Sequence, residues 1–138
     1  MTYTHDVQYV HFRWDQVEER GQVDVRAAVA AFRSFPFKAQ QQEAQMVAGP
    51  TFPTVSFRSK EDGAVLSVWS LNPDQFEVYL ESDGEKVTVD QADTDSIEKV
   101  IAAFFSGQRR DLFKNLAKQK GAVVKRGFLG WARWLAGR

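Results

Sequence analysis

Cysteine is missing from this sequence of 138 residues, and histidine occurs only twice, as His5 and His11. Without cysteine there are no disulfide bonds and no thiolate metal sites. If the two histidines lay in one strand, they would stand about 20 Å apart at roughly 3.3 Å per residue, which is too far for one metal ion. We therefore predict no metal and no cofactor, and we interpret both histidines as surface residues.

Long hydrophobic runs are missing as well. No apolar stretch approaches the roughly 20 residues that a membrane-spanning helix needs, and the first residues, Met1–Asp6, show neither the basic nor the apolar part of a secretion signal. Hydrophobic residues nevertheless make up 43% of the chain and aromatic residues 13%, which is typical of a globular protein. These features predict one folded domain over residues 1–138 and a cytoplasmic location.

Catalytic motifs are the third absence. The chain contains no G-x-S-x-G, no phosphate-binding G-x-x-x-x-G-K-[ST], no H-E-x-x-H and no G-x-G-x-x-G. Glu77 and Glu81 share one face of a strand pattern, but a catalytic carboxyl pair would also need a cleft and a separation of roughly 5–10 Å. A solvated polar face explains these two acids more simply. We predict that the protein is not an enzyme.

The middle third of the chain, in contrast, contains a clear series of strand patterns. Phe76, Val78 and Leu80 alternate with polar residues, and the segment 64–71 is apolar on both faces. Short turns rich in glycine, asparagine and aspartate separate the segments, so neighbouring strands must be antiparallel. The predicted strands of this meander are 54–59, 64–71, 75–81 and 86–90, of which the second is expected to be covered on both faces.

Helical patterns flank the meander. Asp24 is a predicted N-cap of a helix that ends near Ser34. Asp95 and Glu98 resemble a capping box that starts a helix over 95–105, and a further short helix is expected to follow it. Both helices show an apolar stripe with the 3.6-residue period that packs against a core.

The N-terminal part is less regular. Val10 and Trp14 share one face of a predicted strand over residues 6–14, and the polar residues 15–21 are interpreted as a connection. Residues 37–50 fit either a loop or a short surface helix. Together these patterns predict an α+β fold, an antiparallel β-meander of four to five strands with helices packed mainly on one face.

Charge is distributed unevenly, although the net charge is zero. The segment from Gln108 to Arg138 contains nine basic residues and one acid, so it carries +8 and the first 107 residues carry −8. On a helical wheel, residues 122–138 separate into apolar and basic sides, which predicts a basic amphipathic C-terminal helix. Such a helix fits three roles, namely completing the core, lying on a membrane surface, or contacting a partner. The residues for a membrane or partner contact are Lys125, Arg126, Phe128, Trp131, Arg133 and Trp134.

Nucleic acid is not an expected partner. The basic segment and its tryptophans resemble a surface that meets phosphates and stacks on bases. However, the first 107 residues carry a charge of −8, and this acidic body disfavours general binding of polyanions.

The order of these segments resembles small bacterial immunity proteins, which are encoded beside interbacterial toxins and neutralise them by binding. The resemblance covers roughly residues 30–117 and rests on the segments Ser34–Phe37, Pro53–Phe57, Val65–Trp69, Phe76–Leu80, Ile97–Gly107 and Leu112–Phe113. It implies a non-enzymatic inhibitor, an antitoxin in bacterial competition, that occludes the active cleft of a cognate toxin. No binding residue carries over from the resemblance.

The residues themselves point to the acidic and aromatic side of the meander as the partner-binding surface. Trp69 and Tyr79 fall on the less apolar faces of their strands, where exposed aromatic side chains often anchor an interface, and nearby acids steer basic partners. The predicted partner-binding residues are Trp69, Glu77, Tyr79, Glu81, Asp83 and Glu85. A helix covering the two aromatics is the structural alternative. The alternative function is a membrane-surface, scaffold or chaperone protein acting through the C-terminal segment.

Overall fold

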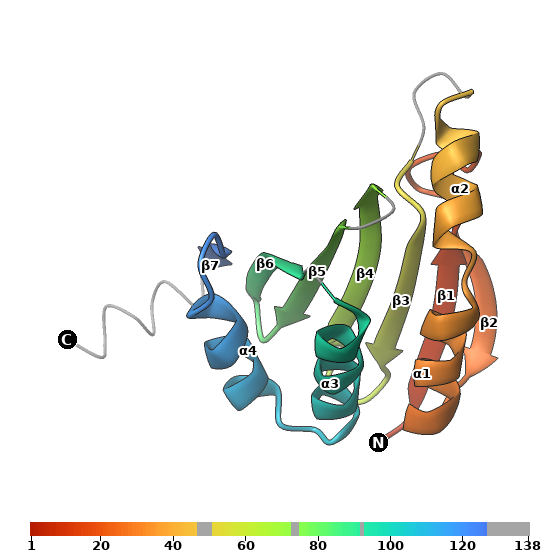
Figure 1. Cartoon of the computed structure of the whole chain (residues 1–138). Helices are drawn as coiled ribbons and strands as arrows, with labels where there is room; N and C mark the ends of the chain where they lie inside the picture. The colour runs from red at the N-terminus through yellow and green to blue at the C-terminus, as the bar shows by residue number, and fades with distance from the viewer. Residues whose placement is uncertain (47–50, 73–74, 92, 127–138) are drawn as a thin grey trace.

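The computed structural model describes residues 1–46, 51–72, 75–91 and 93–126, and the remaining residues are drawn as a thin grey trace in Figure 1. The described residues form one seven-stranded sheet and four helices. The strands are β1 (Tyr3–Gln8), β2 (Glu18–Gln22), β3 (Thr54–Ser59), β4 (Val65–Asn72), β5 (Gln75–Ser82), β6 (Glu85–Gln91) and β7 (Val123–Arg126). The helices are α1 (Val25–Ser34), α2 (Phe37–Ala44), α3 (Thr94–Phe105) and α4 (Arg109–Ala117).

The sheet is antiparallel throughout, with the strand order β2-β1-β3-β4-β5-β6-β7. The chain makes the hairpin β1–β2, passes through α1 and α2, and returns as β3 on the other side of β1. After the meander, α3 and α4 lead to β7 at the opposite edge. The predicted α+β class with an antiparallel sheet is confirmed, and the sheet has more strands than the predicted four to five.

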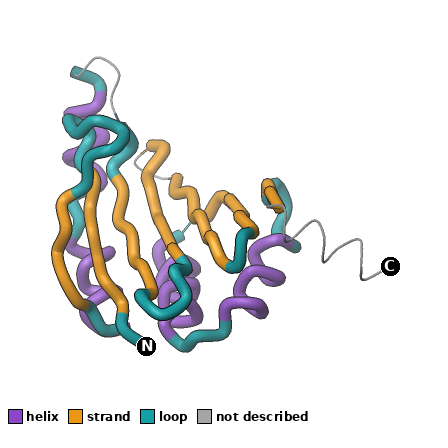
Figure 2. Tube along the Cα trace, turned by 180° about the vertical axis from the view of Figure 1, so that it is seen from behind, coloured by secondary structure: helices purple, strands orange, loops and turns teal. Residues whose placement is uncertain are grey.

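All four helices lie on one face of the sheet. Figure 1 shows them in front of the strands, and Figure 2, from behind, shows the strands with the helices beyond them. The core fills the layer between sheet and helices, and its fully buried members include Phe57, Leu66, Leu80, Ile97 and Phe104. The described residues therefore form two layers, and no described helix packs on the other face of the sheet.

The meander agrees with the sequence pattern to within about one residue at each strand end. Phe76, Val78 and Leu80 point into the core, as their alternation predicted. The expectation that β4 is covered on both faces was wrong. Val65 and Trp69 on its second face are only half-buried, because the helices cover the core face alone and the neighbouring strands supply the remaining contacts.

The N-terminal prediction was wrong in its bounds. The strand is β1, and Tyr3 and Val7 face the core there, while the chain leaves the sheet at Tyr9. Pairing with β3 decides this register, since Val7 lies opposite Val55 in the ladder. β2 was missed because its five residues are all exposed and none has an apolar side chain, which leaves no alternation to detect. Its charged side chains suit an edge strand, because they discourage pairing with another chain.

Two of the four described helices, α1 and α3, start after an aspartate that caps them. The Oδ1 of Asp24 accepts a 2.8 Å hydrogen bond from the Ala27 amide, which confirms the predicted N-cap of α1. The predicted capping box at Asp95 was wrong, because Asp93 is the N-cap of α3 and accepts from the Ser96 amide at 2.7 Å. Glu98 instead forms a bidentate ion pair with Arg33 of α1, which ties the two helices together.

The predicted C-terminal helix was wrong over the residues that can be compared. Residues 123–126 form β7, in which Val124 lies opposite Val87 of β6 and packs against the core. Val123 and Val124 are β-branched residues, which favour a strand. The sequence prediction missed this strand because the whole segment also fits a helical period. The predicted contact residues Phe128, Trp131, Arg133 and Trp134 lie outside the described residues.

Arg109 is the buried cation of the described fold. Its Nε lies 3.2 Å from Oδ2 of Asp62, its Nη2 donates to the Tyr3 hydroxyl at 3.0 Å, and its Nη1 donates to the Phe104 carbonyl. The guanidinium carbon also lies 4.1 Å from the centre of the Phe104 ring. These contacts join β1, the β3–β4 turn, α3 and α4.

Within the described ranges, no helix has the length and apolar character needed to cross a membrane.

Candidate functional site

The candidate site is the sheet surface opposite the helices, which we call the uncovered face. It is formed by Ser56 of β3, Ser67 and Trp69 of β4, Glu77, Tyr79 and Glu81 of β5, and Asp90 of β6, which occupy matching register positions. Trp69 and Tyr79 are half-buried there, and their ring centroids are 6.1 Å apart. Four of the six predicted partner-binding residues thus lie together on the two central strands.

Each aromatic side chain on the uncovered face has its polar atom fixed by a glutamate. The Trp69 Nε1 donates a 2.9 Å hydrogen bond to Oε1 of Glu77, and the Tyr79 hydroxyl donates at 2.9 Å to Oε2 of Glu81. Partial burial and the adjacent Glu81 carboxylate raise the pKa of Tyr79, so the hydroxyl keeps its proton at neutral pH. The rings are therefore held in fixed positions on rigid strands.

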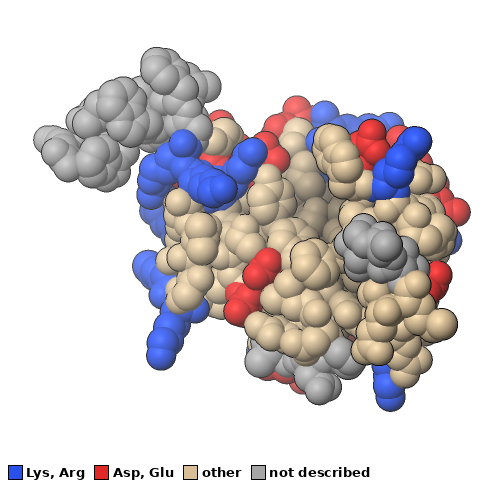
Figure 3. Space-filling model, turned by 90° about the horizontal axis from the view of Figure 1, so that it is seen from above, with Lys and Arg blue, Asp and Glu red and all other residues tan. Residues whose placement is uncertain are grey.

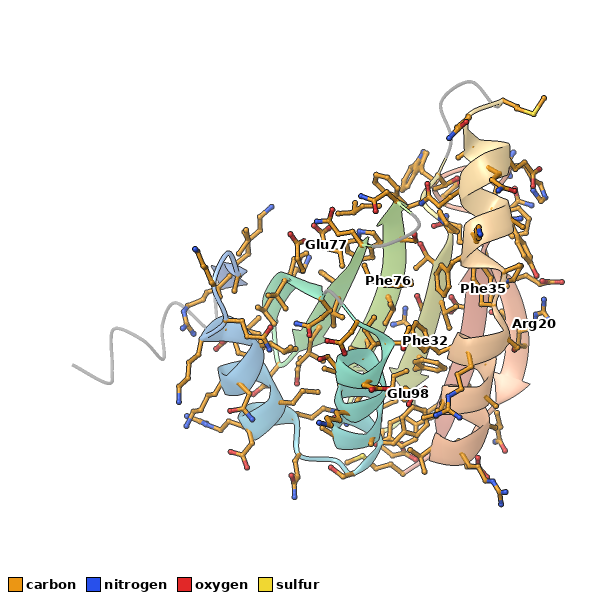
Figure 4. All side chains as sticks on the ribbon, viewed as in Figure 1. Arg20, Phe32, Phe35, Phe76, Glu77 and Glu98 are labelled. Atoms are coloured by element: carbon orange, nitrogen blue, oxygen red, sulfur yellow. The ribbon has the colours of Figure 1, made fainter. Side chains whose placement is uncertain are left out.

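Two carboxyl groups meet at the upper end of the face. Glu77 lies opposite Asp90 in the β5–β6 ladder, and Figure 4 shows Glu77 near the upper end of β5, where the strand begins. Burial and the hydrogen bond with Asp90 raise the pKa of Glu77, because ionising both groups would place like charges side by side. Gln75 donates a 3.2 Å hydrogen bond to Asp90, which fixes the second carboxylate.

A shallow hollow of about 380 Å³ lies beside the aromatic pair, and we call it the aromatic hollow. Its walls include Gln8, Phe52, Trp69 and Tyr79. Small side chains form its floor, where the hydroxyl oxygens of Ser56 and Ser67 lie 2.7 Å apart across β3 and β4. The Phe52 side chain is 52% exposed, which is unusual for phenylalanine and leaves an apolar wall open to a ligand or partner.

Gln8 connects this hollow to the loop between β1 and β2. Its Nε2 lies within hydrogen-bonding distance of three carbonyl oxygens, those of Arg13 (3.1 Å), Trp14 (2.9 Å) and Gln16 (3.1 Å). The loop therefore has a fixed shape at the rim of the face, and Trp14 projects from it with 84% of its surface exposed. Sequence reasoning missed Gln8 and Phe52, since long-range pairing of β1 with β3 brings them to the site.

The other two predicted acids belong to a different surface. Glu85 has the register parity of the core-facing residues of β6 and forms a 2.8 Å ion pair with Arg126 of β7. Asp83 and Glu85 both line a separate cleft beside α4. The sequence-based grouping of all six residues therefore divides into an aromatic set on the uncovered face and a pair of acids at this cleft.

The predicted basic contact residues are also separated. Lys125 lies opposite Lys86 in the ladder, on the side of the uncovered face, whereas Arg126 lies opposite Glu85 and turns toward α4. A strand places successive side chains on opposite faces, so the two cations do not form one basic surface as they would on the predicted helix.

Of the two histidines interpreted as surface residues, His11 lies at the surface and His5 does not. His5 is half-buried on the core side of β1, with its ring centroid 5.3 Å from that of Phe57, and its buried Nε2 has no partner among the described residues. Burial, with the nearby positive charge of Arg20, lowers the pKa of His5. His11 is exposed, and its Nδ1 lies 3.9 Å from Oε1 of Glu43.

The uncovered face presents a fixed aromatic pair beside a hollow, which a partner or ligand could contact. The part of the chain that the structure describes contains no group of three histidine, aspartate or glutamate side chains placed to hold a metal ion. Comparison with protein-family models, with characterised proteins and with solved structures found no match.

Proposed function

We propose that this protein is a non-enzymatic binding protein that recognises another protein through its uncovered face. The observation that carries the proposal is the Trp69–Tyr79 pair, half-buried on the central strands and anchored by Glu77 and Glu81. A seven-stranded sheet normally packs both faces or keeps the second one polar. An aromatic pair with a neighbouring hollow on that second face supports a surface that is completed by a partner.

Preorganisation supports the same proposal. Tryptophan and tyrosine contribute large contact areas with few rotatable bonds, so little conformational freedom is lost when a partner binds. Here both rings are already fixed by hydrogen bonds to glutamates, and Gln8 fixes the rim loop. A partner would meet a surface that needs little rearrangement.

The charge of the uncovered face favours a basic partner. Its acids are Asp6, Glu19, Glu77, Glu81 and Asp90, whereas its cations are Arg58, Lys86 and Lys125. Burial raises the pKa of Asp6, and the positive charge of Arg58 partly offsets that effect. The excess of acids around the aromatic pair would steer a basic surface toward the face and orient it there.

We further propose that the partner is a cognate toxin of a bacterial competitor or sibling cell, and that this protein neutralises it in the cytoplasm by covering a basic active cleft. Support for this finer proposal comes from the resemblance of residues 30–117 to immunity proteins and from the acidic, aromatic character of the uncovered face. Toxins that act on nucleic acids bind phosphates with basic clefts, which an acidic surface complements.

The experiment is co-production with the protein encoded by the adjacent gene. Growth of a host producing that protein should be restored by the wild-type chain, and the two purified proteins should form a complex in calorimetry. Double charge reversal, Glu77→Lys with Glu81→Lys, should weaken the complex at least roughly tenfold, since each lost partner-facing charge is worth about 1 kcal/mol or more. A matched reversal on the helix layer, Asp95→Lys with Glu43→Lys, is the control.

The outcomes separate the two levels of the proposal. A neighbouring protein that is not toxic would overturn the toxin-neutralising role, and equal affinity of the wild type and the Glu77/Glu81 variant would overturn the assignment of the surface. The alternative membrane-surface role depended on a helix over 122–138, and β7 occupies its first residues, so no described residue favours that alternative.

A further inference from the structure

A second surface feature lies on the other side of the molecule, between α4 and the outer strands. It is a cleft of about 710 Å³, bounded by one side of α4, the end of the β5–β6 hairpin and β7, and we call it the cationic cleft. Its volume is in the range of pockets that hold small organic ligands. Figure 3 shows lysine and arginine side chains gathered on this side of the molecule, at the left of the view.

Three cations line the α4 wall of the cleft. Arg110, Lys114 and Lys118 are spaced four residues apart, so they follow one another along one side of the helix. All three are exposed, and none has an ion-pair partner among the described residues. The other two basic residues of the cleft differ in this respect, because Arg109 is paired with Asp62 and Arg126 with Glu85.

This row of charges is unfavourable for the isolated helix. Like charges four residues apart repel one another across a helical turn. In addition, Arg110 lies in the first turn of α4, at the positive end of the helix dipole, where an acid would stabilise the helix and a cation does not. Arg33 and Arg126, in contrast, are each paired with an acid of another element, Glu98 and Glu85. A bound anion would remove the repulsion along this wall.

We propose that the cationic cleft binds a small organic anion that carries two or more phosphate groups and an apolar ring. Lys118 follows Arg110 by eight residues, which is about 12 Å along the helix at 1.5 Å per residue. A row of this length suits a ligand whose negative charges are distributed along a polyphosphate better than a single small ion. Phe113 and Ala117 lie between the cations and line the same cleft. They offer the apolar contact that a ring would use, and the three cations of the α4 wall, which have no ion-pair partner among the described residues, attract the phosphates.

The site explains a feature of the sequence that partner binding through the uncovered face does not use. Five of the nine basic residues between Gln108 and Arg138 line this cleft, namely Arg109, Arg110, Lys114, Lys118 and Arg126. Its position is independent of the aromatic pair, because it lies beyond β5 and β6 on the helix side of the sheet. Ligand binding here and partner binding there can therefore be tested separately.

The test is calorimetry and thermal melting of the full chain with ADP as the probe, at low and at physiological salt. ADP should bind and raise the melting temperature, with affinity that falls as salt rises. The double variant Lys114→Gln with Lys118→Gln should lose at least roughly tenfold in affinity. The matched variant Lys38→Gln with Lys99→Gln, on α2 and α3, removes the same charge outside the cleft and should bind like the wild type.

Three further probes decide what the cleft recognises. Adenosine and inorganic pyrophosphate should each bind at least roughly tenfold more weakly than ADP, because each lacks one half of the ligand. Pyrophosphate binding as strong as that of ADP would overturn the apolar part of the proposal. No ADP binding at millimolar concentration, equal binding by the two double variants, or tighter binding of a hexaglutamate peptide would overturn the ligand class altogether.

Discussion

The indole nitrogen of Trp69 lies 2.9 Å from Oε1 of Glu77, the residue directly opposite it on β5, and Glu77 in turn lies opposite Asp90 on β6. One carboxylate therefore accepts a hydrogen bond from an aromatic anchor and faces a second carboxylate. The first arrangement fixes the ring, and the second raises the pKa of Glu77. A surface selected only for stability would not place two acids there, which is why this pair supports a recognition role.

Replacing Glu77 with glutamine should stabilise the protein at neutral pH. The pKa of Glu77 is raised in the folded state, so the folded protein holds the proton more tightly than the unfolded chain does. As the pH rises and the group ionises, the free energy of unfolding falls, and this loss is absent at a pH where Glu77 is protonated in both states. Glu77→Gln should raise the melting temperature by roughly 1–3 °C at pH 7, since the group is partly exposed, and the gain should disappear near pH 4. The control is Glu81→Gln, because Glu81 lies opposite a cation, Lys86. This variant should not raise the melting temperature. An equal effect at both pH values would contradict the prediction.

Replacing Gln8 with glutamate should loosen the rim loop. The Gln8 amide donates toward three carbonyl oxygens, and a carboxylate of the same shape would place negative charge against them. Trypsin cleavage after Arg13 should become faster by roughly threefold or more, because local opening exposes the loop. Gln22→Glu on the exposed edge strand is the matched control. Unchanged cleavage at Arg13 would show that other contacts hold the loop.

Replacing His5 with phenylalanine should reduce acid sensitivity. Burial and Arg20 lower the folded-state pKa of His5, so the unfolded chain takes up a proton first as the pH falls below about 6.5. Stability contributed by the neutral ring is complete above that pH and is lost as the pH falls toward the folded-state value. We subtract the melting temperature of the wild type from that of His5→Phe at each pH. This difference should be roughly 2–4 °C larger at pH 5.5 than at pH 7.5. His11→Phe should leave this difference near zero.

Replacing Arg109 with methionine should destabilise the whole domain. The guanidinium joins Asp62, Tyr3 and the Phe104 carbonyl in a buried position, and removing it takes the ion-pair partner from Asp62 and one hydrogen bond each from the Tyr3 hydroxyl and the Phe104 carbonyl. The loss should cost roughly 2–3 kcal/mol, which urea denaturation would measure, because Arg109 is buried but the Asp62 side chain is 37% exposed. Arg110→Met changes the neighbouring exposed side chain and should alter the free energy of unfolding by less than about 0.5 kcal/mol.

The sequence predicted those parts of the fold whose pattern is local. Strands β3 to β6 alternate clearly and are joined by short turns, and Asp24 marks the start of α1. The edges of the sheet lacked such a signal. β2 is polar at every position, and β7 is only four residues long within a segment that also satisfies a helical period. In both cases pairing with a neighbouring strand decides the structure, and that pairing is invisible in one local window.

The site divides in the same way. Alternation along β4 and β5 placed Trp69, Glu77, Tyr79 and Glu81 on one face, and the structure has them there. The walls contributed by Gln8 and Phe52 could not be predicted, since they come from segments far apart in the chain. Asp83 and Glu85 were assigned by proximity in sequence, but the register of β6 turns Glu85 to the opposite side.

The position of β1 inside the sheet has a consequence for the order in which the protein is made. β1 leaves the ribosome before β3, its inner partner, which follows only after β2 and two helices. Until then, β1 has only the polar β2 as a neighbour, and an isolated hairpin is at best marginally stable in water. The meander can form as soon as it is synthesised, because its hairpins are local. We therefore expect a late, slow event of folding in which the earlier-made β1–β2 hairpin docks onto the later-made β3.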